Sequence, residues 1–263
     1  MSCVPMRDEN DISEDAILGG RLRIRQPLRG HRIGHDAVLL AAAADACAGE
    51  HAVEFGSGVG AAGLALAARV PGLKVTLIEI DASLCALATD NARLNSLDNR
   101  VDAFCLDIEN SSALKAAGFS DGSADRVLMN PPFRDARHQN VSPDPRRRLA
   151  HVAAPGLLGR WLDTAAWLLK SQGVLTLIWR ADGLQEVLDL LRPVFGNIGV
   201  LPVLPRMNAP ALRVLVRGVK GGGGTQADYP ALVLNNDDGR PTDAAEAILR
   251  EGKTLNLATP AIA

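Results

Sequence analysis

The chain has 263 residues and a mass of 27.7 kDa, which suits one large domain with short extensions. Apolar residues make up 47% and charged residues 22%, a globular composition that excludes a disordered or collagen-like chain. No apolar run has the roughly 18 residues of a membrane helix, and residues 1–10 lack the apolar region of a signal peptide. We therefore expect a cytoplasmic protein that does not span a membrane.

The formal net charge of −2 does not by itself indicate a nucleic-acid-binding protein, but the charges are segregated along the chain. Residues 16–35 and 190–227 each contain five basic residues and no acid, and residues 134–148 contain five arginines against two aspartates. Segregation of this kind suits a phosphate-binding face. Solvated loops are the alternative interpretation, and charge alone does not decide between them.

The four cysteines indicate neither a metal site nor a disulfide framework. They form no C-x-x-C pair, and no histidine lies at metal-ligand spacing from any of them. We expect buried, reduced thiols and no bound metal.

The predicted elements begin with a basic N-terminal part and then alternate. Residues 1–20 are polar and predict a loose segment, residues 21–34 predict short extended structure or turns, and Asp36–Cys47 predicts an alanine-rich helix. Apolar and β-branched runs then predict seven strands, at 52–55, 74–80, 101–106, 125–129, 173–179, 198–204 and 212–217. The further predicted helices are 61–70, 82–97, 111–118, 155–169, 184–191 and 243–249.

This alternation predicts an α/β fold with a Rossmann-like, doubly wound and mostly parallel sheet of seven strands. No clear helix separates the last two strands, so we expect them to form an antiparallel pair at an edge of the sheet. We assign residues 1–34 to a basic N-terminal segment and residues 35–218 to the sheet domain. Residues 219–263 are assigned to a strand–turn–helix extension packed on the same domain.

A glycine-rich loop follows the first predicted strand as E-x-G-x-G-x-G, formed by Glu54, Gly56, Gly58 and Gly60. The spacing differs from the dinucleotide fingerprint G-x-G-x-x-G and from the P-loop. Glycines let a backbone approach a ligand closely and adopt positive φ. A carboxylate at Glu54 would repel a pyrophosphate, but it suits either balancing an ammonium group or fixing the loop.

Acidic residues follow the next two predicted strands. Glu79 ends the second strand, at a position that suits hydrogen bonds to both hydroxyls of a ribose. Asp107 follows the third strand and suits the exocyclic amine of an adenine. An adenosine with a charged amino-acid tail and no phosphate matches the loop and both acids. The sequence therefore predicts S-adenosylmethionine as the cofactor.

The fourth predicted strand ends in Asn130-Pro131-Pro132-Phe133, at an edge where doubly wound sheets bind ligands. The lone pair of an exocyclic amine is delocalised, so two acceptors that bind its hydrogens would favour a pyramidal nitrogen aimed at a methyl donor. The Asn130 side-chain oxygen and the Pro131 carbonyl can supply these acceptors, and Phe133 can stack on a planar base. The tetrapeptide predicts methyl transfer in which alignment and desolvation supply most of the catalysis.

With these motifs, the chain resembles the Rossmann-like amino methyltransferases that carry N-P-P-[FY]. Within that class it looks like the bacterial family that methylates N6 of the adenine beside the anticodon of a valine tRNA. The segment His31–Leu40 is similar to that family's Y-R-F-x-x-D-A-V-L-L, and the tail Leu232–Gly252 is similar to its strand, D-G turn and short helix. The resemblance runs from about Leu22 to Gly252.

The resemblance implies two sets of site residues. The cofactor-binding set is Asp36, Glu54, Gly56, Gly58, Gly60, Glu79, Asp107 and Asn130. Asp36 is implied to lie near the methionine end of the cofactor. The catalytic set is Asn130 and Pro131, which hold the target amine, and Phe133, which stacks on its base.

The same resemblance implies an RNA partner, a tRNA in this family. Anticodon loops present unstacked bases that need little energy to flip. The basic residues expected to contact the RNA backbone are Arg32, Arg134, Arg146, Arg147 and Arg148.

Other acceptors remain open. The N5 amide of a protein glutamine poses the same nucleophile problem, although Phe133 and the absence of a separate N-terminal helical domain disfavour it. Guanine N2 in ribosomal RNA is disfavoured because such enzymes look like duplicated sheets on longer chains, and DNA adenine would require a recognition domain. A non-catalytic binding module is disfavoured because Asn130 and the glycines are present.

Overall fold

The computed structural model describes residues 11–30, 32–132, 156–255 and 257. Within these residues the main sheet has the strand order β10-β8-β9-β7-β6-β3-β4-β5, and β11 also pairs with β8. A separate two-stranded sheet of β1 and β2 lies outside it. The strands of the main sheet are β3 His51–Phe55, β4 Lys74–Glu79, β5 Val101–Cys105, β6 Ala124–Met129, β7 Leu169–Arg180, β8 Phe195–Arg206, β9 Arg213–Lys220, β10 Gln226–Asp228 and β11 Leu232–Asn235.

The predicted alternation is confirmed, because β3 to β7 are parallel and helices connect strands of this parallel part. Small and apolar residues of high helix propensity fill these helices, and Asp81 caps α3 by accepting from the Ser83 and Leu84 amides. No helix in the described part of the chain is long and apolar enough to cross a membrane. The helices are α1 His35–Ala43, α2 Ala61–Arg69, α3 Ala82–Leu94, α4 Ser111–Ala116, α6 Leu157–Leu168, α7 Leu184–Leu191 and α8 Asp243–Leu249.

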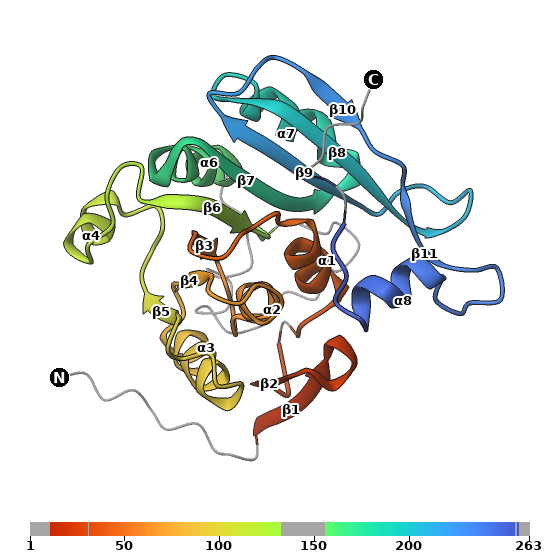
Figure 1. Cartoon of the computed structure of the whole chain (residues 1–263), viewed down its shortest axis with the longest axis horizontal. Coiled ribbons are helices and arrows are strands. Elements are labelled where there is room, and N and C mark those ends of the chain that lie inside the picture. The colour runs from red at the N-terminus through yellow and green to blue at the C-terminus, as the bar shows by residue number, and fades with distance from the viewer. Residues whose placement is uncertain (1–10, 31, 133–155, 256, 258–263) are drawn as a thin grey trace.

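Helices cover both faces of the sheet, so the core has two layers (Figure 1). On one face, α1, α2, α3 and α8 contribute buried residues such as Leu40 and Leu66. On the other face, α4, α6 and α7 contribute residues such as Leu168 and Leu191. The parallel strands between them are apolar on both sides, as expected for a sheet buried on both faces.

The antiparallel pair of β8 and β9 is present as predicted, with β9 lying between β7 and β8. Two short strands that the seven-strand prediction did not include, β10 and β11, pair in parallel with opposite parts of β8. They bring the main sheet to nine strands in the described residues. The chain after β9 therefore continues the sheet beyond β8.

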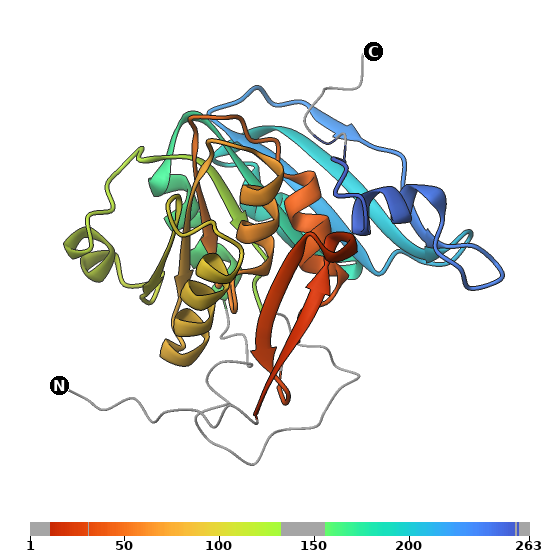
Figure 2. The same ribbon diagram turned by 60° about the horizontal axis from the view of Figure 1, so that its bottom comes forward.

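The N-terminal part forms a β-hairpin, so the prediction of a loose segment is wrong for residues 12–20. β1 Ile12–Ile17 pairs antiparallel with β2 Leu22–Pro27 around the 3₁₀ turn Leu18–Gly20. The polar side chains of β1 suggested a loose segment, but Glu14 forms ion pairs with Arg23 and Arg25 of β2. Leu22 and Ile24 are buried, and β2 packs against α3 (Figure 2).

Candidate active site

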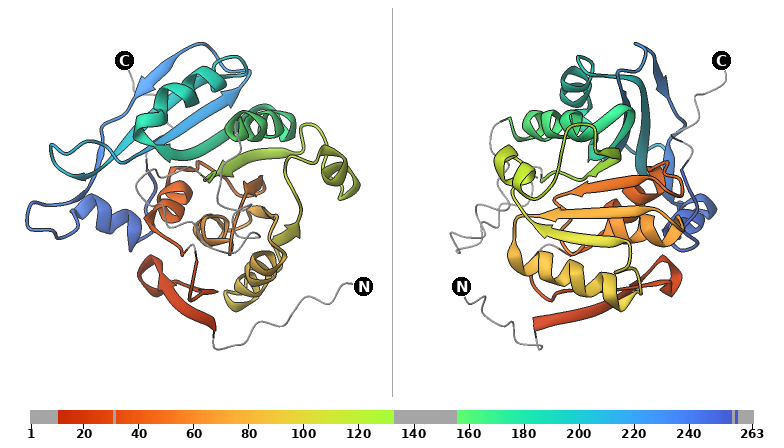
Figure 3. Two further views of the ribbon diagram at one scale, coloured as in Figure 1. Left: turned by 180° about the vertical axis from the view of Figure 1, so that it is seen from behind. Right: turned by 60° about the vertical axis from the view of Figure 1, so that its left-hand side comes forward.

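The carboxyl ends of β3, β4, β5 and β6 lie side by side, because these strands are parallel and in register (Figure 3). Phe55 at the end of β3 is paired with Ile78 of β4 and with Met129 of β6. This edge brings together the glycine loop, Glu79, Asp107 and Asn130, which follow or end these four strands. The sequence had predicted this arrangement from the position of each motif at a strand end.

The glycine loop leaves β3 with left-handed backbone at Gly56, Gly58 and Gly60, where φ is 59°, 57° and 85°. Such φ values favour glycine over residues with a Cβ. The Ser57 amide donates to the Ile78 carbonyl at 3.0 Å, which ties the loop to the end of β4. No described atom lies within 4 Å of the place where a Cβ on Gly58 would stand. The loop therefore presents open backbone at Gly58.

Trp161 of α6 supports the start of this loop, a role that the sequence did not reveal. A Cβ on Gly56 would stand 2.6 Å from the Trp161 ring. The Trp161 ring is buried and packs edge-on against Phe55, with ring centroids 6.3 Å apart. The indole thus fixes where the chain turns from β3 into the glycine loop.

Glu79 joins the ends of two strands through its carboxylate. One oxygen accepts from the Gly58 amide at 2.8 Å and the other accepts from the Asp81 amide at 2.9 Å. The side chain is buried, and this burial raises its pKa above the ordinary value. A carboxylate oxygen can accept more than one hydrogen bond, so Glu79 retains acceptor capacity for a ligand while it holds the loop.

The Glu54 side chain binds the helix that follows the glycine loop. Its carboxylate accepts from the Gly63 amide in the first turn of α2 at 2.6 Å, and the residue is 5% exposed. A Cβ on Gly63 would stand 2.7 Å from this carboxylate and 2.4 Å from Leu77, so only glycine fits there. Of the two roles considered for Glu54, the geometry supports fixing the loop and the helix that follows it. The pKa of Glu54 is raised to about 8: desolvation raises it most, the Gly63 hydrogen bond opposes this, and the Glu79 charge adds to the rise.

Replacing Glu54 with glutamine is expected to flatten the pH dependence of stability. The pKa of Glu54 is about 8 in the folded protein, against the ordinary value of 4.5, so between these two values the folded state binds the proton more tightly than the unfolded state does. The free energy of unfolding that this proton contributes is therefore fully present below pH 4.5 and is lost as the pH rises through about 8. The loss is up to about 1.4 kcal/mol per pH unit. Urea unfolding of the Glu54→Gln variant across this window should lack that loss.

Glu79 has a raised pKa as well and contributes a slope of the same sign. That slope remains in both proteins, so the difference between their profiles reports on Glu54. Parallel pH profiles for wild type and variant would contradict a carboxyl that is protonated in the folded state.

Two residues flank the loop on the β4–β5 side. Asp107 is exposed after β5, and its carboxylate accepts from the Glu109 amide at 2.9 Å. Ile80, directly after Glu79, is 61% exposed, an unusual exposure for a large apolar side chain at a strand end. Sequence reasoning missed Ile80 because it continues an apolar strand pattern, and its exposure follows only from the fold.

Asn130 follows β6 and carries an acceptor without a donor. Its side-chain oxygen is buried and accepts no hydrogen bond from the described residues. The buried Ser57 hydroxyl in the glycine loop also has no hydrogen-bond partner among them. A buried polar group without a partner costs about 1–3 kcal/mol, so each such group in a folded protein calls for an explanation. Pro131 beside it is buried.

The structure pairs the carboxylate of Asp36 with Arg213. The Arg213 Nε atom donates to Asp36 at 2.9 Å. Arg213 stands opposite Arg180, the last residue of β7, so the N-terminus of α1 lies at the same edge of the sheet as the glycine loop. Asp36 is thus near the predicted site, and its carboxylate already has a cationic partner.

Arg32 is built into the hairpin. Its guanidinium forms an ion pair with Asp15 at 2.7 Å and donates to the Ser13 hydroxyl and the Pro27 carbonyl. The remaining predicted site residues, Phe133, Arg134, Arg146, Arg147 and Arg148, lie outside the described residues.

The sequence model of the methyltransferase small domain family matches residues 32–203, which is more than half of the chain. The chain belongs to this family. The matched region extends from before β3 into β8 and includes the glycine loop, Glu79 and Asn130. The resemblance to methyltransferases that the motifs indicated is therefore confirmed.

Two curated relatives differ in their substrates. The tRNA1(Val) (adenine(37)-N6)-methyltransferase of Porphyromonas gingivalis is 34% identical over 59% of this chain and 61% of its own length. The release factor glutamine methyltransferase of Chlorobaculum tepidum is 30% identical over 62% of this chain and 56% of its own length. The chain thus spans about three fifths of the length of either relative.

A solved structure supports the fold over most of the chain. The predicted O-methyltransferase from Agrobacterium tumefaciens aligns with a TM-score of 0.71 and 25% identity, covering 84% of this chain and 98% of that protein. The predicted fold class is confirmed by this likeness and by the observed sheet.

Proposed function

We propose that this member of the methyltransferase small domain family transfers a methyl group from S-adenosylmethionine to N6 of an adenine in structured RNA. Residues 35–218 would form the catalytic domain, and a tRNA would be the target. The observation that carries the proposal is the buried, unpartnered oxygen of Asn130 at the strand edge that also holds the glycine loop. This oxygen lacks a hydrogen-bond donor, and the amine of a substrate would supply one.

The residues of this edge fit the cofactor. The open backbone at Gly58 leaves room for a ligand, and the Glu79 carboxylate has acceptor capacity for ribose hydroxyls. The exposed Ile80 side chain offers an apolar surface to an adenine, and Asp107 an acceptor for its amine. When bound, S-adenosylmethionine supplies an activated methyl group on a sulfonium, so no metal ion is required by this chemistry.

Asn130 and Pro131 would orient the target nitrogen. The Asn130 oxygen and the Pro131 carbonyl accept the two amine hydrogens, which turns the nitrogen lone pair towards the methyl group. The bond from nitrogen to the methyl carbon forms as the carbon–sulfur bond breaks, and its electron pair stays on sulfur. The extra proton then leaves the nitrogen for solvent, so no residue has to remove a proton beforehand.

The choice of RNA rests on two supports. The relative from P. gingivalis is named for N6 of a tRNA adenine. Two acid-free basic segments, residues 16–35 and 190–227, supply basic side chains for a phosphate backbone. Arg23, Arg25, Arg32 and Arg213 of these segments are already paired with acids, whereas Arg29 and Arg206 are exposed and form no ion pair within the described residues. A glutamine side chain carries the same kind of planar amine, so the experiment must separate the two substrates.

The purified chain, incubated with methyl-labelled S-adenosylmethionine, is expected to transfer label to undermethylated small RNA and not to a protein extract. RNase treatment should release all of the transferred label. Label in protein would move the assignment to the glutamine methyltransferases. Label in neither pool, from a protein that binds the cofactor, would contradict both acceptors.

A further inference from the structure

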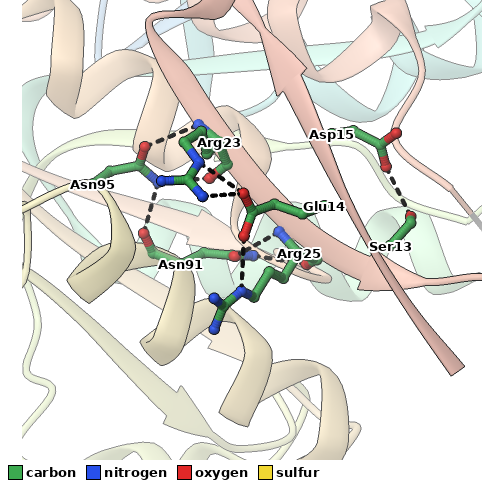
Figure 4. A network of polar contacts seen from close by, with 7 residues as sticks. All are labelled: Ser13, Glu14, Asp15, Arg23, Arg25, Asn91 and Asn95. Carbon is green, nitrogen blue, oxygen red and sulfur yellow. Dashed lines mark hydrogen bonds and ion pairs between the residues drawn. The ribbon is translucent and has the colours of Figure 1, made fainter. Parts of the chain in front are cut away.

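Two asparagines, one in the last turn of α3 and one directly after its end, bind the backbone of β2 (Figure 4). Asn95 accepts from the Arg23 amide at 2.9 Å and donates to the Arg23 carbonyl at 2.7 Å. Asn91 repeats the pattern on Arg25, with distances of 2.7 Å and 3.0 Å. Side-chain amides thus take the place of a neighbouring strand along the edge of β2, and they dock the hairpin on the sheet domain.

Asn91 differs from Asn95 in a further bond, which leads to the glycine loop. Its side-chain nitrogen also donates to the Val59 carbonyl at 3.0 Å. Asn91 has 0% exposure, so water cannot replace this bond. One buried amide therefore joins the hairpin backbone to the loop backbone between Gly58 and Gly60.

The loop is consequently held at two adjacent residues from two different elements. Glu79 of β4 binds the Gly58 amide, and Asn91 of α3 binds the Val59 carbonyl. Three glycines with left-handed backbone give this loop many alternative conformations, all of which a ligand would have to exclude. A loop that is already fixed binds its ligand more tightly, because less ordering remains to be done on binding.

We propose that Asn91 is a positioning residue for the cofactor loop and that its bond to the Val59 carbonyl raises cofactor affinity. The inference rests on the proposed function, since it assumes that the loop binds S-adenosylmethionine. Asn91 contacts the loop at the Val59 carbonyl, and it acts on the cofactor through the loop backbone.

The test compares Asn91→Ala with Asn95→Ala. Both variants remove the paired bonds to one residue of β2, but only Asn91→Ala removes the bond to Val59. Asn95→Ala also removes the bond from the Asn95 side chain to the Asn91 carbonyl, which lies at the end of α3 and does not touch the loop. We expect Asn91→Ala to weaken binding of S-adenosylhomocysteine, measured by calorimetry, by about tenfold. Asn95→Ala should lower the melting temperature and leave this affinity within about twofold. Amide hydrogen exchange of residues 56–60 should accelerate in Asn91→Ala alone.

Asn91→Ser is the second variant in case the alanine variant does not fold, because its hydroxyl is too short to bridge β2 and the loop. Unchanged affinity and unchanged exchange in a folded Asn91 variant would overturn the inference, as would equal losses of affinity in the Asn91 and Asn95 variants. Failure of the wild-type protein to bind S-adenosylhomocysteine or S-adenosylmethionine would instead overturn the proposed function and this role for Asn91 with it.

Discussion

Asn130→Ala is expected to lower the rate of methyl transfer by about 100- to 1,000-fold, the effect typical of removing one polarising hydrogen bond from an active site. The Asn130 oxygen is buried and accepts no bond from any described residue, so its removal leaves the fold intact and affects the amine alone. Single-turnover transfer of label to RNA measures the loss.

Cofactor affinity is the internal control for this variant. The resemblance also implied a cofactor contact by Asn130, but affinity should change by no more than about twofold, since the glycine loop and Glu79 are untouched. Asn236→Ala, in an exposed turn after β11, is the matched control and should retain full activity. A fully active Asn130→Ala enzyme would show that the amine is oriented by other groups, and the proposed mechanism would be abandoned.

Glu79→Ala is expected to weaken cofactor binding by about 10- to 100-fold. The substitution leaves the Gly58 and Asp81 amides without their acceptor and removes the oxygens proposed to bind the ribose. Calorimetric titration with S-adenosylhomocysteine measures the effect. The rate of transfer at saturating cofactor should fall much less, because Glu79 is proposed to contact the ribose and not the reacting atoms.

Asp102→Ala provides the matched control for Glu79, because Asp102 is an exposed acid on the neighbouring strand β5. It should bind the cofactor as the wild type does. Equal affinity of the Glu79 variant and the wild type would place the cofactor elsewhere on the sheet.

Most of the sheet could be predicted from the sequence, because its signals are local. The parallel strands β3, β4, β5 and β6 are apolar runs that end in, or are closely followed by, a glycine, an acid or Asn130. Helices α2, α3 and α7 match their predicted ranges to within a few residues. The hairpin was missed because β1 is stabilised by non-local ion pairs between Glu14 and the arginines of β2.

The site could be predicted to the level of motifs but not of contacts. The expected edge of the sheet does carry the loop, Glu79 and Asn130. The link from Asn91 to Val59 has no sequence signal, since an asparagine within an amphipathic helix gives no hint of its partner. The same is true of Arg32, whose position in a basic segment predicted an RNA contact while its guanidinium binds Asp15 in the hairpin.

Nucleoside analysis of the methylated RNA tests the central claim most directly. RNA that has been methylated by the wild-type chain with labelled S-adenosylmethionine is digested to nucleosides and separated by chromatography with mass detection. The account predicts label in N6-methyladenosine, because the acceptor pair of Asn130 and Pro131 selects an exocyclic amine and the P. gingivalis relative is named for adenine N6. Label in a ribose 2′-O-methyl nucleoside, or in N2-methylguanosine, would contradict the assignment of adenine N6 as the acceptor.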